Sequence, residues 1–220
     1  MYISRIRIDP NRAGARRLLA SPQRLHAVIA AATDSPSSRP LWRLDPWAGG
    51  LNLLVVSQGE PDFTSLLAQA ELLPEDGWQS SDYTRFLDAL APGQGWMFRL
   101  AANPVRSLRR TKPDGRLSRG KRVPIVGASG LQEWLLQRAT ALGVQLQADS
   151  FAVTQRRTKD FTRREPEGSG TGRRRVVIAT AQFDGTLQVT DADLLREALR
   201  NGVGSAKAYG CGLLTLAPVP

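Results

Sequence analysis

The same order of secondary-structure elements can be read twice along this chain of 220 residues. Glycines at Gly93 and Gly95 separate the two series. In the first series, alternating apolar residues predict strands at 2–8, 41–47 and 51–56 and helices at 21–33, 63–70 and 83–90. In the second, the same patterns predict strands at 96–108, 144–154, 173–183 and 213–217 and helices at 129–142 and 191–200. Each series reads strand–helix–strand–strand–helix, with a further strand to close it.

Two tandem units of this kind predict an α+β protein made of two ferredoxin-like (RRM-like, βαββαβ) domains, each an antiparallel sheet with helices on one face. We place the boundary after Gly93, so that the domains are residues 1–93 and 94–220. The assignment rests on element order, because no residue-level repeat relates the halves. Polar loops are predicted at 35–40 and 111–122, and a long hairpin tip at 163–172.

Positive charge is concentrated in the second half of the chain. Residues 1–95 carry 9 basic and 10 acidic side chains, whereas residues 96–220 carry 21 basic and 10 acidic ones. A polyanion is the natural partner of such a surface, and nucleic acid is favoured. A membrane surface is disfavoured, since the basic runs do not lie on amphipathic helices. The alternative is a basic surface that serves only solubility.

Composition also excludes several kinds of site. One cysteine permits no internal disulfide, and one histidine with one cysteine permits no His/Cys metal cluster. A magnesium site made only of carboxylates stays open, but no tight acidic group suggests one. We therefore expect no metal and no cofactor. No run is apolar enough to cross a bilayer, and residues 1–7 lack a signal-peptide core, so we expect a cytoplasmic protein without a membrane partner.

A glycine-rich run extends from Gly202 to Gly212 and holds Lys207 between a predicted helix and the last predicted strand. Glycine permits positive φ and close backbone approach, and free N–H groups beside a lysine suit a phosphate. The run matches neither the nucleotide P-loop nor the dinucleotide fingerprint. Two interpretations remain open: a loop that holds phosphates, or a turn required by chain geometry.

His26 is the one side chain able to move a proton near neutral pH without a perturbed pKa. Ser21-Pro22 starts its helix, and His26 lies on the flank of the apolar stripe that begins at Leu25. A helix N-terminus favours an anion and a neutral imidazole. RNA carries its own nucleophile, the 2′-hydroxyl, so scission needs a base and charge stabilisation but no metal. A purely structural histidine is the competing interpretation.

Basic residues also cluster on the predicted hairpin. Arg156, Arg157 and Lys159 lie on one arm and residues 173–175 on the other, which favours contact with the phosphates of structured nucleic acid. Arg16 and Arg17 add charge on a short helical segment before Leu18. A solvated hairpin end is the alternative.

Cys211 gives a rival hypothesis for the chemistry. Paired with His26, it would act as the nucleophile of an acyl transfer. Its position between two glycines, directly before an apolar strand, is more typical of a small buried thiol.

The run Gly202-Val-Gly-Ser-Ala-Lys-Ala-Tyr-Gly-Cys-Gly-Leu-Leu-Thr-Leu resembles the glycine-rich signature of the CRISPR-associated endoribonucleases of type I-E systems (the CasE family). The opening Met1-Tyr-Ile-Ser-Arg5 and a histidine on the first long helix are also similar to that family. The resemblance covers both ends, the length and the domain order, whereas the middle of the chain matches only in element order.

This resemblance implies a protein that binds the CRISPR repeat stem-loop and cuts at the 3′ base of the stem without metal. The implied reaction is attack by the 2′-hydroxyl, leaving a 2′,3′-cyclic phosphate and a 5′-hydroxyl. The implied partners are the repeat RNA and the other subunits of the Cascade complex. His26 matches the catalytic histidine, and Lys207 matches the lysine of the glycine-rich loop. Gly202, Gly204 and Ser205 of that loop, with Arg156 and Arg157, are the implied RNA contacts.

One position departs from the family pattern. Some members have a tyrosine three residues before the histidine, where this chain has Gln23. Glutamine donates and accepts hydrogen bonds but is neither acid nor base, so a two-residue proton transfer is in question. His26 then acts as base, as acid or as a positioning group, and we favour the base. The competing function is a non-catalytic RNA-binding module of paired RRM-like domains, which the missing aromatic RNP1 pattern disfavours.

Overall fold

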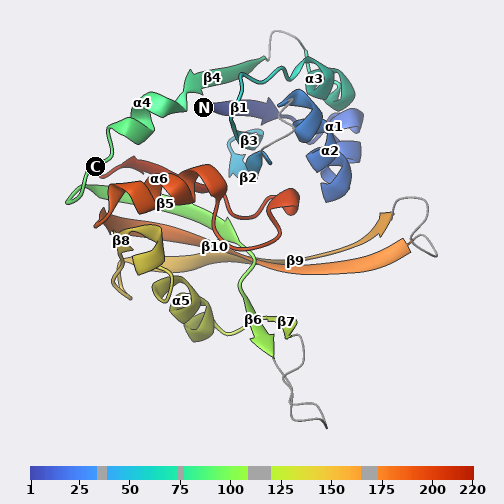
Figure 1. The fold of residues 1–220 in the computed structure, drawn as a ribbon. Coiled ribbons are helices and arrows are strands. Elements are labelled where there is room, and N and C mark those ends of the chain that lie inside the picture. Colours follow the sequence, from blue (N-terminus) through green and yellow to red (C-terminus); the bar gives the residue numbers. More distant parts are fainter. Residues whose placement is uncertain (34–38, 74–76, 109–119, 165–172) are drawn as a thin grey trace.

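The structure, a computed structural model, describes residues 1–33, 39–73, 77–108, 120–164 and 173–220. The predicted hairpin tip at 165–172, most of the basic loop at 111–122 and most of the loop at 35–40 fall outside the described residues. Figure 1 shows two sheets, with the chain passing from the first to the second through α4 (Tyr83–Asp88).

The first sheet contains β1 (Tyr2–Ile8), β2 (Leu41–Trp47), β3 (Gly50–Ser57) and β4 (Trp78–Asp82). Its order is β2-β3-β1-β4 and every neighbouring pair is antiparallel. This is the strand order of a ferredoxin-like domain. The helices that cover one face of this sheet are α1 (Ala13–Leu19), α2 (Pro22–Ala32) and α3 (Thr64–Ala70).

Both faces of the first sheet are apolar, and each packs against a different core. Ile6, Leu53 and Val55 join the core that α1, α2 and α3 cover. Leu41 and Val56 point to the opposite face, because neighbouring residues of a strand alternate. These two belong to the core of the second half. The first sheet is therefore sandwiched between its own helices and the rest of the protein.

The second sheet repeats the ferredoxin-like order with one strand divided. It contains β5 (Gly95–Ala102), β10 (Arg173–Val189) and β11 (Leu214–Pro218) in the order β11-β5-β10. The free edge of β10 pairs with β8 (Val144–Gln145) at one end and with β9 (Phe151–Arg164) along the rest. α5 (Ala128–Leu136) and α6 (Ala192–Asn201) contribute Leu131, Trp134 and Leu195 to its core.

Several predicted boundaries were wrong, each for a local reason. The single strand expected at 96–108 stops at Ala102, because Pro104 has no N–H for the ladder. The chain then forms a separate ribbon from β6 (Val105–Leu108) and β7 (Lys121–Pro124), so Lys121 and Arg122 lie in a strand and not in the predicted loop.

The strand expected at 144–154 is interrupted by a turn, in which the Ser150 hydroxyl donates to the Gln147 carbonyl at 2.9 Å. The helix expected at 129–142 ends at Leu136 and resumes as the 3₁₀ turn η2 (Thr140–Leu142). Gly143 ends that turn with φ 68°, in the left-handed region.

The division at residues 93 and 94 remains a proposal. Each sheet belongs to one half, but α4 lies before the boundary while its Tyr83 and Leu87 pack in the core of the second half. The halves therefore share one continuous interface. Within the described part of the chain, no helix is long and apolar enough to cross a membrane.

Candidate active site

His26 stands on α2, whose start was predicted correctly from Ser21-Pro22. The Ser21 side chain accepts a hydrogen bond from the Arg24 amide at 3.3 Å, and Pro22 occupies the first turn. Leu25, with Val28, Ile29 and Ala32, faces the core. His26 is half-buried on the flank of this stripe.

The imidazole of His26 is held in its neutral form. Burial lowers its pKa below the ordinary value of 6.5, and the positive charge of Arg39 lowers that pKa further. Its Nδ1 atom is buried and has no hydrogen-bond partner among the described residues. A neutral imidazole that is only half-buried can take a proton from a ligand.

The glycine-rich run lies against the helix of His26. Its 3₁₀ turn η3 (Lys207–Tyr209) packs on α2. Burial lowers the pKa of Lys207, and the charge of Arg39 lowers it as well. Arg39 therefore acts electrostatically on both predicted site residues, although no sequence pattern distinguished it at the end of a Ser/Pro-rich loop. The helix of His26 and this loop are therefore in direct contact.

Two glycines of the run allow close packing against β2. A Cβ on Gly202 would lie 2.7 Å from Leu41 Cδ2, and one on Gly210 would lie 2.7 Å from Trp42 Cζ3. Both residues have positive φ, at 73° and 79°. The geometric interpretation of the run therefore holds at these two positions. The Lys207 ammonium donates to the Asn201 carbonyl at the end of α6.

The first turn of the run is less crowded. A Cβ on Gly204 would lie 3.4 Å from Trp134 Cζ2, at ordinary contact distance, and Ser205 is half-exposed beside it. Backbone at these two positions is therefore more open to a ligand than at Gly210.

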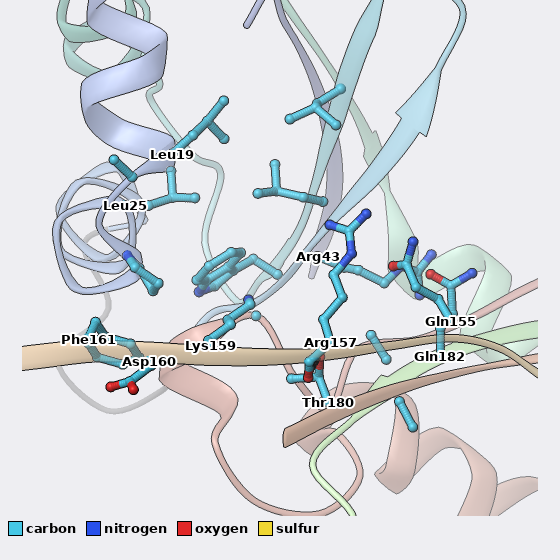
Figure 2. A pocket seen from close by; sticks show the side chains of 18 residues that line it. Leu19, Leu25, Arg43, Gln155, Arg157, Lys159, Asp160, Phe161, Thr180 and Gln182 are labelled. Atoms are coloured by element: carbon cyan, nitrogen blue, oxygen red, sulfur yellow. Dashed lines mark hydrogen bonds between the residues drawn. The ribbon is translucent and has the colours of Figure 1, made fainter. Parts of the chain in front are cut away.

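A cavity of about 400 Å³ opens between the two halves next to this site. Figure 2 shows Leu19 and Leu25 on one side and the β9 residues Arg157 and Lys159 on the other. The walls thus pair a mainly apolar surface from the first half, which also includes Arg43, with amides and cations from the second. They include Pro22, Trp42, Arg43, Gln155, Phe161, Thr180, Gln182 and Gly210.

The two predicted arginines of β9 do not share a face. Arg157 lines the cavity between the halves. Arg156 points to the other side of the strand, where its Nη1 donates to the Val126 carbonyl at 3.3 Å. Period-two alternation along a strand requires this separation. Of the two, only Arg157 lines the cavity beside α2.

Lys159 joins the hairpin to the glycine-rich run. Its ammonium donates to the Tyr209 carbonyl at 2.9 Å and lies 5.9 Å from the centre of the Trp42 ring. Phe161 adds a ring contact with Tyr209, with 5.0 Å between centroids. Burial lowers the pKa of Lys159, and the positive charge of Arg157 lowers it further. These aromatic partners were not predicted from sequence.

The other predicted residues surround this centre. Gln23 is half-buried on α2 one turn before His26. On α1, the Arg16 guanidinium donates to the Asn11 carbonyl at 2.6 Å, and Arg17 forms an exposed ion pair with Glu71 at 2.6 Å. Arg17 is therefore already engaged by an acid.

Cys211 fits the buried interpretation. Its side chain is fully buried, and burial raises the pKa of the thiol to about 11, which argues against a nucleophile paired with His26. Among the described residues, no three His, Cys, Asp or Glu side chains are grouped so as to hold a metal ion.

Comparison with known proteins agrees with this architecture. A family model described as CRISPR associated protein matches residues 1–218. The CRISPR-associated endoribonuclease Cse3 of Thermus thermophilus is 33% identical over 236 residues, covering 99% of this chain and 100% of the relative. The Cascade subunit CasE of Escherichia coli is 32% identical over 126 residues, covering 56% of this chain and 57% of the relative.

Among solved structures, the CRISPR endoribonuclease Cse3 bound to a 19-nucleotide RNA superimposes with a TM-score of 0.71. The two chains are 29% identical, and the match covers 99% of each. Family model, full-length relative and fold thus agree over nearly the whole chain. This protein therefore belongs to the CRISPR-associated protein family, as a member of its type I-E CasE (Cse3) endoribonuclease group.

Proposed function

We propose that this protein is a metal-independent endoribonuclease that binds the stem-loop of CRISPR repeat RNA and cuts it at the 3′ base of the stem. It then acts as a subunit of a Cascade complex. Relatives named as endoribonuclease Cse3 and as Cascade subunit CasE, and an RNA-bound structural neighbour, support the substrate and the partners. We place it in the cytoplasm, since its single cysteine fits a reducing compartment.

The observation that carries the mechanism is the half-buried, neutral His26 on a helix packed against the loop of Lys207. His26 takes the proton of the RNA 2′-hydroxyl. That oxygen bonds to the adjacent phosphorus while the bond to the 5′-oxygen breaks, leaving a 2′,3′-cyclic phosphate and a 5′-hydroxyl that takes up a proton. General base catalysis of this kind supplies about 10²–10⁴-fold in rate.

The surrounding cations stabilise the charge that develops on the phosphate. Arg39 is close enough to lower the pKa of both His26 and Lys207. The cations Arg39 and Lys207 therefore lie in the same region of the site as His26. Gln23, one turn before His26, has an amide that can hydrogen-bond and orient the reacting groups, in place of an acid or base. The two cations thus act through their charge, and Gln23 acts by positioning the reacting groups.

The RNA stem is held by the cations around the cavity and by the loop beside it. Arg157 and Lys159 line the cavity from β9. The glycine-rich run, which reaches the cavity at Gly210, offers its backbone at Gly204 and Ser205 to the phosphates, whereas the Gly202 amide already donates to the Ala198 carbonyl at 2.8 Å. Contact with phosphates farther along the stem comes from Arg156 on the other face of the hairpin and from Arg16 and Arg17 on α1.

The His26→Ala variant tests this function through cleavage of the repeat RNA. We expect binding to be retained and the single-turnover rate constant to fall by about 10²–10⁴-fold, because the base is lost. Ala27→Ser, an exposed change on the same helix, is the matched control and should cut normally. Repeat RNA with a 2′-deoxy sugar at the cleavage nucleotide should bind and remain intact.

The mechanism is wrong if the 2′-deoxy RNA is cut, or if EDTA abolishes cleavage. If the unaltered protein gives no product at saturating concentration, the chain is an RNA-binding module without catalysis. End-group analysis of the products must find a cyclic phosphate.

A further inference from the structure

Arg43 lies on β2 of the first half, and its side chain is only 3% exposed. A buried guanidinium is costly unless it is paired and its donors are satisfied. Asp45, two residues along on the same face of β2, supplies the opposite charge. Arg43 Nε donates to Asp45 Oδ1 at 2.7 Å, and Nη2 donates to Asp45 Oδ2 at 2.8 Å.

The remaining donors of Arg43 all cross to the second half. Nη1 donates to the carbonyls of Arg99 on β5 and of Leu213, each at 3.0 Å. Nη2 donates to the Thr215 hydroxyl of β11 at 2.8 Å. A guanidinium has five N–H donors. Two of them bind the carboxylate and three bind the facing sheet, so every donor is used.

The hydrogen bonds of Arg43 fix the orientation of β2 relative to the second sheet as well as the distance between them. The guanidinium is planar and rigid, so its bonds to two carbonyls and a hydroxyl are satisfied in one orientation of β2 relative to β5 and β11. A lysine at this position would keep the charge but would lose the planar fork.

The residues next to Arg43 on β2 contact both parts of the candidate active site. Trp42 belongs to the same apolar core as Leu25 of α2, the helix of His26. Its ring also faces Gly210 at a distance that leaves no room for a Cβ. Leu41 meets Gly202 in the same way. A shift of β2 therefore moves α2 relative to the glycine-rich run.

We propose that Arg43 is a positioning residue: it holds the two halves in the one relative orientation that places His26 against the Lys207 loop. The inference rests on the proposed function, since it concerns the geometry of that site. Arg43 acts through β2 and Trp42, without touching the reacting atoms. Its loss should impair cleavage more than RNA binding.

Two substitutions test this role, with one matched control. Arg43→Lys keeps the charge but loses the planar guanidinium. Thr215→Val keeps the shape of the side chain and removes the hydroxyl, which accepts from Arg43 and donates to the Arg99 carbonyl at 3.4 Å. Arg196→Lys is the control. Arg196 also joins the halves, donating to the carbonyls of Leu87 at 2.8 Å and Leu90 at 2.7 Å, but its partners do not lie on β2.

For each variant we would measure the single-turnover cleavage rate constant at saturating protein and the affinity for uncleavable 2′-deoxy repeat RNA. Misplacement by about 1 Å costs about 10²-fold in rate, so Arg43→Lys should lose about that factor. Thr215→Val should lose about tenfold, as expected for one bond to a charged group. Affinity should change by less than about threefold in both. Arg196→Lys should cut and bind normally.

A second measurement needs no cleavage. His26 is the single histidine of the chain, so the imidazole signals in a proton NMR titration of the RNA-free protein report on it alone. In Arg43→Lys the imidazole should titrate closer to 6.5, since loosened packing admits water to a ring whose pKa burial lowers. Arg196→Lys should titrate as the unaltered protein does.

The proposal is overturned if both variants cut at the normal rate, or if affinity falls by as much as the rate does. Should Arg43→Lys fail to fold, Thr215→Val decides, because it leaves Arg43 and Asp45 intact. If the unaltered protein does not cut repeat RNA, the proposed function fails. The NMR titration then still decides whether Arg43 controls the surroundings of His26.

Discussion

The protonation state of His26 follows from its immediate surroundings. Burial and the charge of Arg39 both disfavour the imidazolium, so the pKa moves below 6.5 and the ring is neutral at physiological pH. Burial also disfavours the charged form of Cys211, but for a thiol this raises the pKa and keeps the group protonated. Two potentially reactive side chains are thus assigned opposite roles by burial: one available as a base, the other inert.

The pH dependence of kcat/KM tests this assignment at the level of the residue. A base must be unprotonated, so the rate should rise with pH through the lowered pKa of His26 and level off above about pH 6.5. A rate that instead falls as pH rises through that pKa would identify His26 as the acid. Arg39→Ala should move the rising limb toward higher pH, because it removes one cause of the lowered pKa.

At the scale of the element, the glycine-rich run meets two demands at once. Its backbone borders the proposed RNA site, and its glycines permit contact with β2. Gly210 and Gly204 have the same φ of 79°, yet a Cβ would meet Trp42 at 2.7 Å from Gly210 and Trp134 at only 3.4 Å from Gly204. Alanine would have the same backbone strain at both positions, but only at Gly210 would it also overlap with a neighbouring side chain.

We expect Gly210→Ala to destabilise the protein more than Gly204→Ala. Both changes place alanine at positive φ, at about 1 kcal/mol each, and overpacking against Trp42 adds about 1–3 kcal/mol at Gly210 alone. Urea unfolding of both variants gives the difference. Equal free energies of unfolding would mean that Trp42 moves aside without cost.

Capping and turn residues predicted element ends well, because their effect depends only on neighbouring residues in the sequence. Ser21-Pro22 correctly marked the start of α2, and Gly143 marks the end of the 3₁₀ turn η2, although the helix predicted up to it stops at Leu136. Pro104 is an equally local signal, but the apolar run around it concealed the break in the strand. The ferredoxin-like order was also predictable, since it depends on the sequence of elements.

The site was predictable only in part, because its remaining residues depend on contacts between distant strands. Trp42 and Arg43 looked like ordinary strand residues, and nothing local indicates that Arg43 binds the Leu213 carbonyl, 170 residues away. Arg39 likewise acquires its role from the position of α2. The alternation of Arg156 and Arg157 follows from strand geometry, but which face meets the cavity is set by the packing of the halves.

At the scale of the whole molecule, the excess positive charge of the second half meets a mainly apolar wall from the first. Arg157 and Lys159 extend into the cavity from β9, opposite Leu19 and Leu25 (Figure 2). Figure 1 shows the β9–β10 hairpin extending beyond the second sheet on the side where α1 and α2 lie. Cations of the second half are thus placed in the cavity beside α2, the helix that carries His26.

The salt dependence of RNA binding tests this arrangement. Arg157→Ala should weaken binding of the repeat RNA and reduce the slope of log affinity against log salt by about 1, as for one lost phosphate contact. Arg156→Ala, the same change on the opposite face, should have a smaller effect. Filter binding at salt concentrations from about 50 to about 200 mM compares the two variants. A larger effect of Arg156→Ala would place the RNA on the other face of the hairpin.

The sandwiched first sheet limits how the specificity of this protein can be engineered. In RNA-recognition domains of the same topology, unpaired bases stack on aromatic residues of an open sheet face. Here the corresponding face, with Leu41 and Val56, lies inside the protein. Aromatic substitutions there would force the halves apart without creating a reading surface. New sequence preferences must therefore be built into the hairpin and loops at the rim of the cavity.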